Sequence, residues 1–218
     1  MNRRNIFYCL VSLILFSASY GCTPESPEPP TTTSAASPTP TSTASPASSK
    51  TKTDTISIEG EKRQIVLRFY DKPALPFTTY VPDTAFVDEV TTLGNGSAVR
   101  FYAKKPDGTA NQAAYVQIAF PSEPVTVAKM TDSVTGKGGL LELNQWQLTS
   151  RSTAEADLYP WAREKIGFKQ SNNNILGAVF VGESNGKAFT VIEHYPGDSA
   201  AAFAPLAGKI LSNLQLRK

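Results

Sequence analysis

The stretch from Thr23 to Ser49 is the part of this chain that most limits what can fold. Of its 27 residues, 14 are Ser or Thr and 7 are Pro, and apart from proline no apolar side chain in it is larger than that of alanine. Such a segment cannot bury enough apolar surface to offset the entropy lost on ordering, so we expect a disordered linker. With residues 50–54 included, the linker covers 23–54 and leaves residues 55–218 as one globular domain.

The first 22 residues have the composition of an export signal. A basic pair, Arg3 and Arg4, precedes an apolar run over residues 6–16, and small residues then lead to Cys22. A basic start, a short apolar middle and a small-residue end are typical of a signal peptide. Because a bilayer span needs about 20 apolar residues, the run predicts export rather than a permanent transmembrane helix.

Because it ends on Gly21-Cys22, this segment resembles a bacterial lipoprotein signal peptide. In that family the cysteine becomes the lipidated first residue of the mature chain. The resemblance implies that Cys22 anchors the protein to a bacterial membrane on its exported side, whether periplasmic, lumenal or at the cell surface. Ser19 stands where the family prefers leucine, so ordinary cleavage near residues 17–19, with Cys22 left as a free thiol, stays open as the alternative.

Cysteine and charge content exclude several kinds of site. The two cysteines are Cys9 and Cys22, and Cys9 lies in the segment expected to be removed. The mature domain is therefore predicted to have no internal disulfide, cysteine-based zinc site or thiol nucleophile. Residues 55–218 hold 17 Lys and Arg against 16 Asp and Glu, a net charge of +1. This balance argues against a nucleic-acid partner.

Residues 55–120 favour an antiparallel meander of β-strands. Runs rich in β-branched and aromatic residues alternate with turn signals, of which Asn95-Gly96 is a strong hairpin signal. The expected strands are 55–58, 64–70, 77–81, 86–93, 97–103 and 113–120.

The hydrophobic period changes in the next segment. Ser122 can cap a helix over about 123–134, and a strand over 140–148 is expected to follow. Ser152 and Glu155 then form a capping box, which predicts a second helix to about residue 166.

The last part of the chain combines a hairpin and a helix. Strands are expected over 175–181 and 187–195, joined across Asn185-Gly186. The spacing of the final apolar residues predicts a C-terminal amphipathic helix. Its buried face is expected to consist of Phe203, Leu206, Ile210, Leu211 and Leu214.

Strands in a run, with helices inserted late and at the end, predict an α+β domain in which about three helices cover an antiparallel sheet. The closing segments GAVFVG and KAFTVIEHYP, followed by a helix of the AFAPLAGKILSNL type, resemble the Mog1/PsbP-like α/β/α sandwich. The resemblance lies mostly in residues 174–218 and carries no functional residue across. It implies a small binding or assembly module, since PsbP-type proteins are extrinsic factors of photosystem II on the lumenal side of the thylakoid.

One motif invites a catalytic interpretation. Residues 182–186 fit G-x-S-x-G, the nucleophile elbow of hydrolases, with His194 and Asp198 as candidate partners of Ser184. An elbow requires a helix directly after the serine, whereas a strand is expected here. At about 3.3 Å per residue along that strand, Ser184 and His194 would lie roughly 25 Å apart. A general base must come within about 3 Å, so we predict that neither residue does chemistry.

No cofactor or metal motif stands out. Residues 136–139 (GKGG) lack the spacing of a phosphate-binding loop and are expected to end a helix. Asp83, Asp88 and Glu89 are the closest acidic group, but a Ca²⁺ loop needs more oxygen ligands around a tight turn. We therefore predict no cofactor and no metal.

A few other residues have two possible roles. The pair Lys104-Lys105 is expected to form a solvated turn. Trp146, Tyr159 and Trp161 can belong either to the core or to the floor of a shallow groove, because buried and interface aromatics look alike in a sequence.

Two classes of function stay open. The anchor, the long linker and the lack of a coherent catalytic set favour a membrane-tethered, non-enzymatic binding or assembly module with a protein partner. The alternative is an exported hydrolase that uses scattered carboxylates, or Ser184 with His194. A partner-sized groove would favour the module, and a pocket with convergent carboxylates or a nucleophile beside its base would favour the enzyme.

Overall fold

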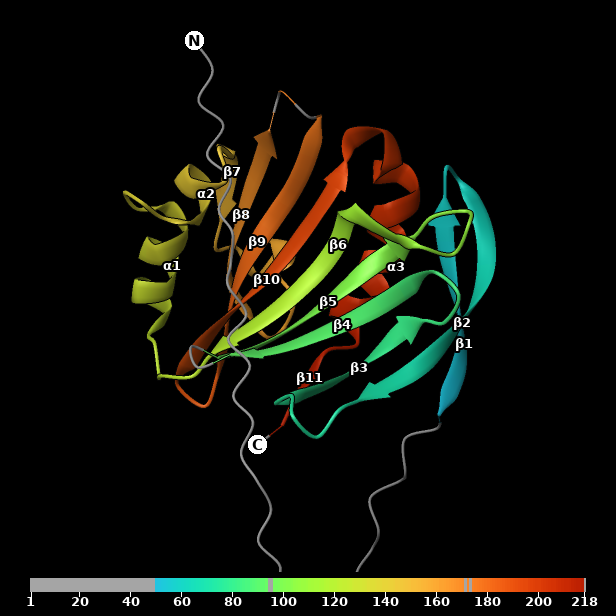
Figure 1. Cartoon of the computed structure of the whole chain (residues 1–218), viewed down its shortest axis with the longest axis horizontal. Coiled ribbons are helices and arrows are strands. Elements are labelled where there is room, and N and C mark those ends of the chain that lie inside the picture. The colour runs from blue at the N-terminus through green and yellow to red at the C-terminus, as the bar shows by residue number, and fades with distance from the viewer. Residues whose placement is uncertain (1–49, 94–95, 171, 173, 218) are drawn as a thin grey trace, which may run out of the picture. The chain divides into compact units, whose positions relative to one another are not determined.

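The computed structural model describes residues 50–93, 96–170, 172 and 174–217 (Figure 1). Cys9, Cys22, the predicted signal segment and the linker over 23–49 lie outside these residues. Within the described part, no helix combines the length and the apolar character needed to cross a membrane.

A four-stranded antiparallel sheet has the strand order β1-β2-β3-β11. Its strands are β1 (Thr51–Ile58), β2 (Glu61–Asp71), β3 (Phe77–Pro82) and β11 (Gln215–Leu216). The predicted first hairpin is confirmed, and its turn residues Glu59 and Gly60 have φ values of 52° and 86°. These positive values are typical of a type I′ turn.

The fold begins earlier than predicted. Strand β1 starts at Thr51, whereas the sequence placed the domain boundary at Thr55. The side chains of this first segment are tied to the end of the C-terminal helix: Lys52 Nζ donates to Asn213 Oδ1 at 2.6 Å, and Lys209 Nζ donates to Asp54 at 2.8 Å. Polar contacts bind this part of β1 to the rest of the domain. Its sequence therefore lacks the alternation of apolar residues that would predict a strand.

The second sheet has seven antiparallel strands in the order β4-β5-β6-β10-β9-β8-β7. These are β4 (Phe86–Leu93), β5 (Gly96–Lys104), β6 (Ala110–Pro121), β7 (Gln147–Ser152), β8 (Ala162–Gln170), β9 (Ile175–Ser184) and β10 (Lys187–Pro196). The predicted closing hairpin is confirmed: Asn185 and Gly186 connect β9 to β10 with φ values of 51° and 73°.

The helices are α1 (Val127–Thr135), α2 (Leu140–Leu143) and α3 (Ala200–Ser212), with short 3₁₀ turns η1 (Glu155–Asp157) and η3 (Gly197–Ser199). The predicted first helix exists, but its N-cap is Thr126 and not Ser122: Lys129 N donates to Thr126 Oγ1 at 3.3 Å. The predicted C-terminal helix is confirmed as α3, and Phe203, Ile210 and Leu211 on it are buried.

Two predicted elements are wrong. Residues 140–148 do not form one strand, because α2 occupies 140–143 and Gln145, with φ of 58°, turns the chain into β7. The helix predicted from the capping box at Ser152 and Glu155 is absent, since η1 is followed by strand β8 over that range.

The seven-stranded sheet is covered on both faces. On one face α3 and the four-stranded sheet enclose the larger apolar core, whereas α1 and α2 enclose a second core on the other face. Figure 1 shows α1 and α2 beside β7, β8 and β9, and α3 behind β5 and β6. The domain is therefore α+β and mainly antiparallel, but two sheets replace the single sheet expected, and α3 shares its layer with the smaller one.

The aromatic residues left open by the sequence belong to the core. The exposed fractions of Trp146 and Trp161 are 8% and 7%, and Tyr159 packs partly buried against the larger core.

Candidate binding groove

The sheet face that carries α1 and α2 continues past them onto β10, β6, β5 and β4. No described helix lies in front of β4 and β5 on this side (Figure 1). We term this region the open face. Its strand residues include Glu89, Thr91, Ala98, Arg100, Tyr102, Tyr115, Gln117, Ala119, Thr190 and His194.

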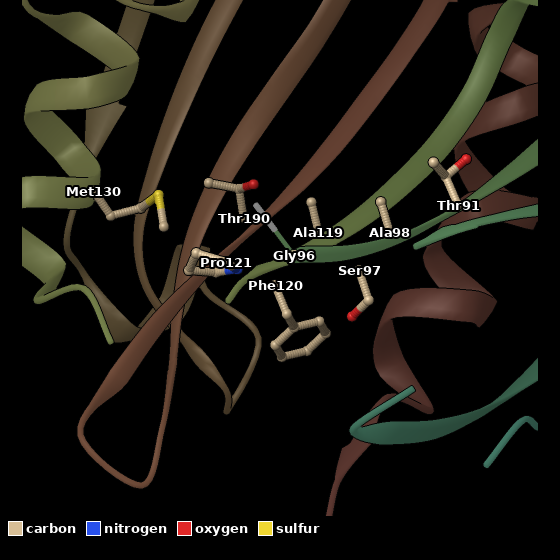
Figure 2. A pocket seen from close by; sticks show the side chains of 9 residues that line it. All are labelled: Thr91, Gly96, Ser97, Ala98, Ala119, Phe120, Pro121, Met130 and Thr190. Carbon is tan, nitrogen blue, oxygen red and sulfur yellow. The ribbon is translucent and has the colours of Figure 1, made fainter. Parts of the chain in front are cut away.

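A row of small side chains crosses the open face. Thr91 pairs with Ala98, Ala98 pairs with Ala119, and Ala119 pairs with Thr190. Residues directly opposite each other in antiparallel strands project to the same face. Figure 2 shows these four side chains on one side of the sheet, with Met130 of α1 facing them. Because these four side chains are short and that of Met130 is long, the surface is hollowed along this row.

The row forms the floor of a hollow with a volume of 290 Å³. The residues around it are Thr91, Gly96, Ser97, Ala98, Ala119, Phe120, Pro121, Met130 and Thr190. A second hollow, of 250 Å³, is lined by Glu89, Thr91, Ala98, Arg100 and Gln117. The two hollows share Thr91 and Ala98, so they adjoin each other on the open face, and we term the pair the open groove.

Gly96 shapes one end of the open groove. Its φ of +143° lies in a region that glycine favours, and an added Cβ would overlap the carbonyl oxygen of Phe120 and lie 2.9 Å from Pro121 Cα. The start of β5 can therefore approach the end of β6 only because residue 96 has no side chain.

The middle of the open groove is polar and carries both charges. Arg100 Nε donates to Gln117 Oε1, its Nη1 donates to Tyr102 Oη at 3.3 Å, and its guanidinium lies 5.1 Å from the Tyr115 ring centroid. These contacts fix the guanidinium in position. Glu89 pairs across the strands with Arg100, yet neither side chain forms an ion pair with any described residue. Both charges are available to a ligand.

An aromatic row begins at Tyr115, next to Arg100 on the open face. The His194 ring stacks on Tyr115 with centroids 4.7 Å apart, and Trp146 stacks on Phe168 at 3.9 Å. His194 Nδ1 donates to the Ala113 carbonyl at 3.0 Å. Burial lowers the pKa of His194, which disfavours the charged form of this packed ring.

The catalytic alternative around Ser184 has no matching geometry. Ser184 pairs with Lys187 at the hairpin turn, and His194 pairs with Gly177 near the other end of β10. Asp198 accepts a hydrogen bond from Asn174 at 2.9 Å and lies in η3, so these three residues are not assembled into a triad.

The acidic residues singled out in the sequence are separated by the sheet. Arg68 Nη2 lies 3.0 Å from Asp88 and its Nε lies 3.5 Å from Asp83, which makes both carboxylates part of one ion-pair group. Glu89 projects instead to the open face. Within the described ranges, no cluster of His, Cys, Asp and Glu is arranged to hold a metal ion.

A buried carboxylate lies on the same sheet face beneath α1. Glu164 has an exposed fraction of 5%, accepts a hydrogen bond from Thr131 at 2.7 Å and pairs with Arg151. Burial raises the pKa of Glu164, but the hydrogen bonds from Arg151 and Thr131 outweigh burial and hold the pKa below its usual value. With its oxygens occupied in this way, Glu164 fixes α1 to the sheet.

Sequence reasoning missed the open groove. The alternation in residues 97–103 and 113–120 does place Ala98, Arg100 and Tyr102 on one side of a strand, and Gln117 and Ala119 on one side of the next. Small and polar residues on one face of interior strands are the signal that indicates an uncovered face.

Comparisons with known proteins give no family for this chain. No protein-family model matches it, and no curated protein matches it. A crystal structure of a protein from Bacteroides thetaiotaomicron is similar with a TM-score of 0.38 and 16% identity, over 69% of this chain and 48% of that chain. This chain thus spans about half the length of that protein.

Proposed function

We propose that this protein is an exported, lipid-anchored, non-enzymatic binding module whose partner occupies the open groove. The observation that carries the proposal is the groove itself: two adjoining hollows over β4, β5, β6 and β10, with a floor of small side chains and with two charged side chains that form no ion pair with any described residue.

The lining of the groove favours a polypeptide segment of a protein partner. The floor at Ala98 and Ala119 lets an extended chain lie close to the sheet. Above it, Arg100 can pair with a carboxylate, Glu89 with an ammonium or guanidinium, and Gln117 with a backbone amide. A chain that carries both charges matches this arrangement better than a uniformly charged polymer does.

The anchor and linker complete the proposal. Lipid on Cys22 would hold the chain at the exported face of a membrane, and residues 23–49 would separate the anchor from the fold. A coil of this length spans roughly 30 Å, and a fully extended polyproline-like chain approaches about 80 Å. The domain could then search for partners within that distance of the membrane.

We also propose that the domain has the α/β/α sandwich fold of the Mog1/PsbP-like proteins. The order β9, β10, α3 and the presence of helices on both faces of the larger sheet support this proposal.

Filling the groove tests the binding proposal. The full-length protein would be captured from its own membrane as wild type, as Ala98→Trp and as Thr153→Trp, a control at an exposed loop position outside the groove. We expect the wild type and the control to capture the same partner protein. Ala98→Trp should capture at least about tenfold less of it. Equal recovery with all three proteins, each shown to be folded by circular dichroism, would contradict the proposal.

A further inference from the structure

A separate hollow, outside the open groove, lies at the opposite end of β4, β5 and β6, on the sheet face that α3 covers. Its volume is 430 Å³, and it is bounded by the start of β4, the turn between β5 and β6, and the first half of α3. It shares no lining residue with the open groove, and a ligand there would be bound independently of the proposed partner.

The floor of this hollow is the edge of the larger apolar core. Phe86 and Phe203 have exposed fractions of 2% and 3%, and their rings meet at 6.0 Å in an edge-to-face arrangement. Leu206 packs beside them and also lines the hollow. A hydrocarbon group placed here would extend the core and remove apolar surface from water.

Two positively charged side chains lie on the rim, and Lys105 is close enough to Asp107 to help the hydrogen bonds from Thr109 lower the pKa of that carboxyl. Lys104 and Lys105 are exposed, and within the described part of the chain neither forms an ion pair. The acid in the same turn, Asp107, already accepts hydrogen bonds from the backbone N and the Oγ1 of Thr109, at 2.9 and 2.6 Å. The rim therefore favours an anion.

A hydroxyl group adds a neutral donor to the rim. Ser199 lines the hollow where η3 leads into α3, and its side chain makes no capping hydrogen bond to that helix. A carboxylate can accept from this hydroxyl and from an ammonium at the same time.

From this combination we infer that the hollow binds a small anionic amphiphile, with its hydrocarbon body on Phe86 and Phe203 and its carboxylate beside Lys104 and Lys105. The volume lies within the range of about 300 to 1,000 Å³ that is usual for small-molecule sites. A medium-chain aliphatic monocarboxylate has both required parts, and decanoate serves as the probe.

Calorimetric titration of the full-length protein tests the inference. We expect decanoate to bind saturably with a Kd below about 1 mM, and decanol, which has the same body without the charge, to bind at least about tenfold more weakly. Acetate, which has the charge without the body, should not bind in this range. No saturable binding of decanoate, or equal affinity for decanol, would overturn the inference.

Variants locate the binding. The double change Lys104→Gln and Lys105→Gln should raise the Kd for decanoate about tenfold, whereas Lys62→Gln with Lys137→Gln, which removes two exposed lysines elsewhere, should leave it unchanged. Ala202→Trp, at an exposed position that lines the hollow, should abolish binding while the domain stays folded. Unchanged affinity in Ala202→Trp, or an equal loss in both lysine pairs, would contradict the assignment.

Discussion

The indole Nε1 of Trp161 donates a hydrogen bond to the backbone carbonyl of Leu211 at 3.0 Å. This contact joins the segment just before β8 to the last turn of α3, where carbonyl groups have no partner within the helix. The neighbouring carbonyl of Ile210 accepts from Thr79 Oγ1 of β3 at 2.6 Å. The end of α3 is thus bound to β3 of the smaller sheet and to the segment that leads into β8 of the larger one, which fixes the position of this helix.

Leu211 provides the direct test of that position. Its side chain is fully buried in the larger core, so Leu211→Ala should lower the free energy of unfolding by about 2–5 kcal/mol, measured by urea denaturation. The matched control is Leu143→Ala in α2, where the side chain is 74% exposed and a change below about 0.5 kcal/mol is expected. A loss for Leu211→Ala as small as the one expected for Leu143→Ala would show that α3 does not pack as described.

The C-terminal helix could be predicted because its burial follows from local spacing. Strand β8 could not, because a charge occupies one of its inward positions. Glu164 shares the face of Ile166 and Phe168, whereas Ala162 belongs to the larger core on the other face, because the register shifts between Ala162 and Glu164. A buried glutamate and this shift together hide the period of two. The partners of Glu164, Thr131 and Arg151, come from α1 and β7, and no local pattern indicates such a long-range pairing.

The open groove could not be predicted from local sequence patterns either. Each strand shows which residues share a face, but only the pairing of β6 with β10 puts Thr190 beside Ala119. The same pairing leaves α1 next to the row, so the groove depends on contacts between segments far apart in the chain.

Gly96 should be the glycine least tolerant of substitution near the groove. Gly96→Ala combines an unfavourable φ with a clash against Phe120 and Pro121, so a loss of about 2–4 kcal/mol is expected by chemical denaturation. Gly186→Ala is the matched control: φ is +73° there and nothing lies within 4 Å of the added Cβ, so only about 1 kcal/mol of backbone cost is expected. A smaller loss at Gly96 than at Gly186 would argue against the close approach of β5 and β6.

Glu193 should make the stability depend on pH. Burial raises the pKa of its carboxyl from 4.5 to about 7, with Lys165 opposing the shift. A raised folded pKa means that the folded state binds the proton more tightly, so this contribution is fully present below pH 4.5 and is lost as the pH rises through about 7. The loss amounts to at most about 3 kcal/mol.

The measurement is the difference between the wild type and Glu193→Gln in thermal unfolding across this pH range. The difference removes the opposite trend from His194, whose lowered pKa makes stability rise with pH. The variant should gain stability relative to the wild type above pH 7, and Glu123→Gln, at an exposed position, should follow the wild type. Parallel curves for wild type and Glu193→Gln would refute the raised pKa of this carboxyl.

Cys22→Ser tests the proposed anchor. Labelling with a radioactive or clickable fatty acid should be lost and the protein should leave the membrane fraction, because only a thiol at this position can take the lipid. The melting temperature of the domain should stay the same, since the described fold begins at β1. Labelling that persists in the variant, or is absent from the wild type, would instead favour the free-thiol alternative.

The central claim, that a partner occupies the open groove, is tested most directly by photo-crosslinking in the native membrane. A benzophenone side chain would replace Thr91, which is exposed and lines both hollows of the open groove. As the control, the same group would replace Thr153, which is exposed outside the groove. We predict one discrete protein adduct from position 91 that is absent at position 153 and is suppressed by adding Ala98→Trp. An adduct of equal yield at both positions, or one that Ala98→Trp leaves unchanged, would contradict the claim.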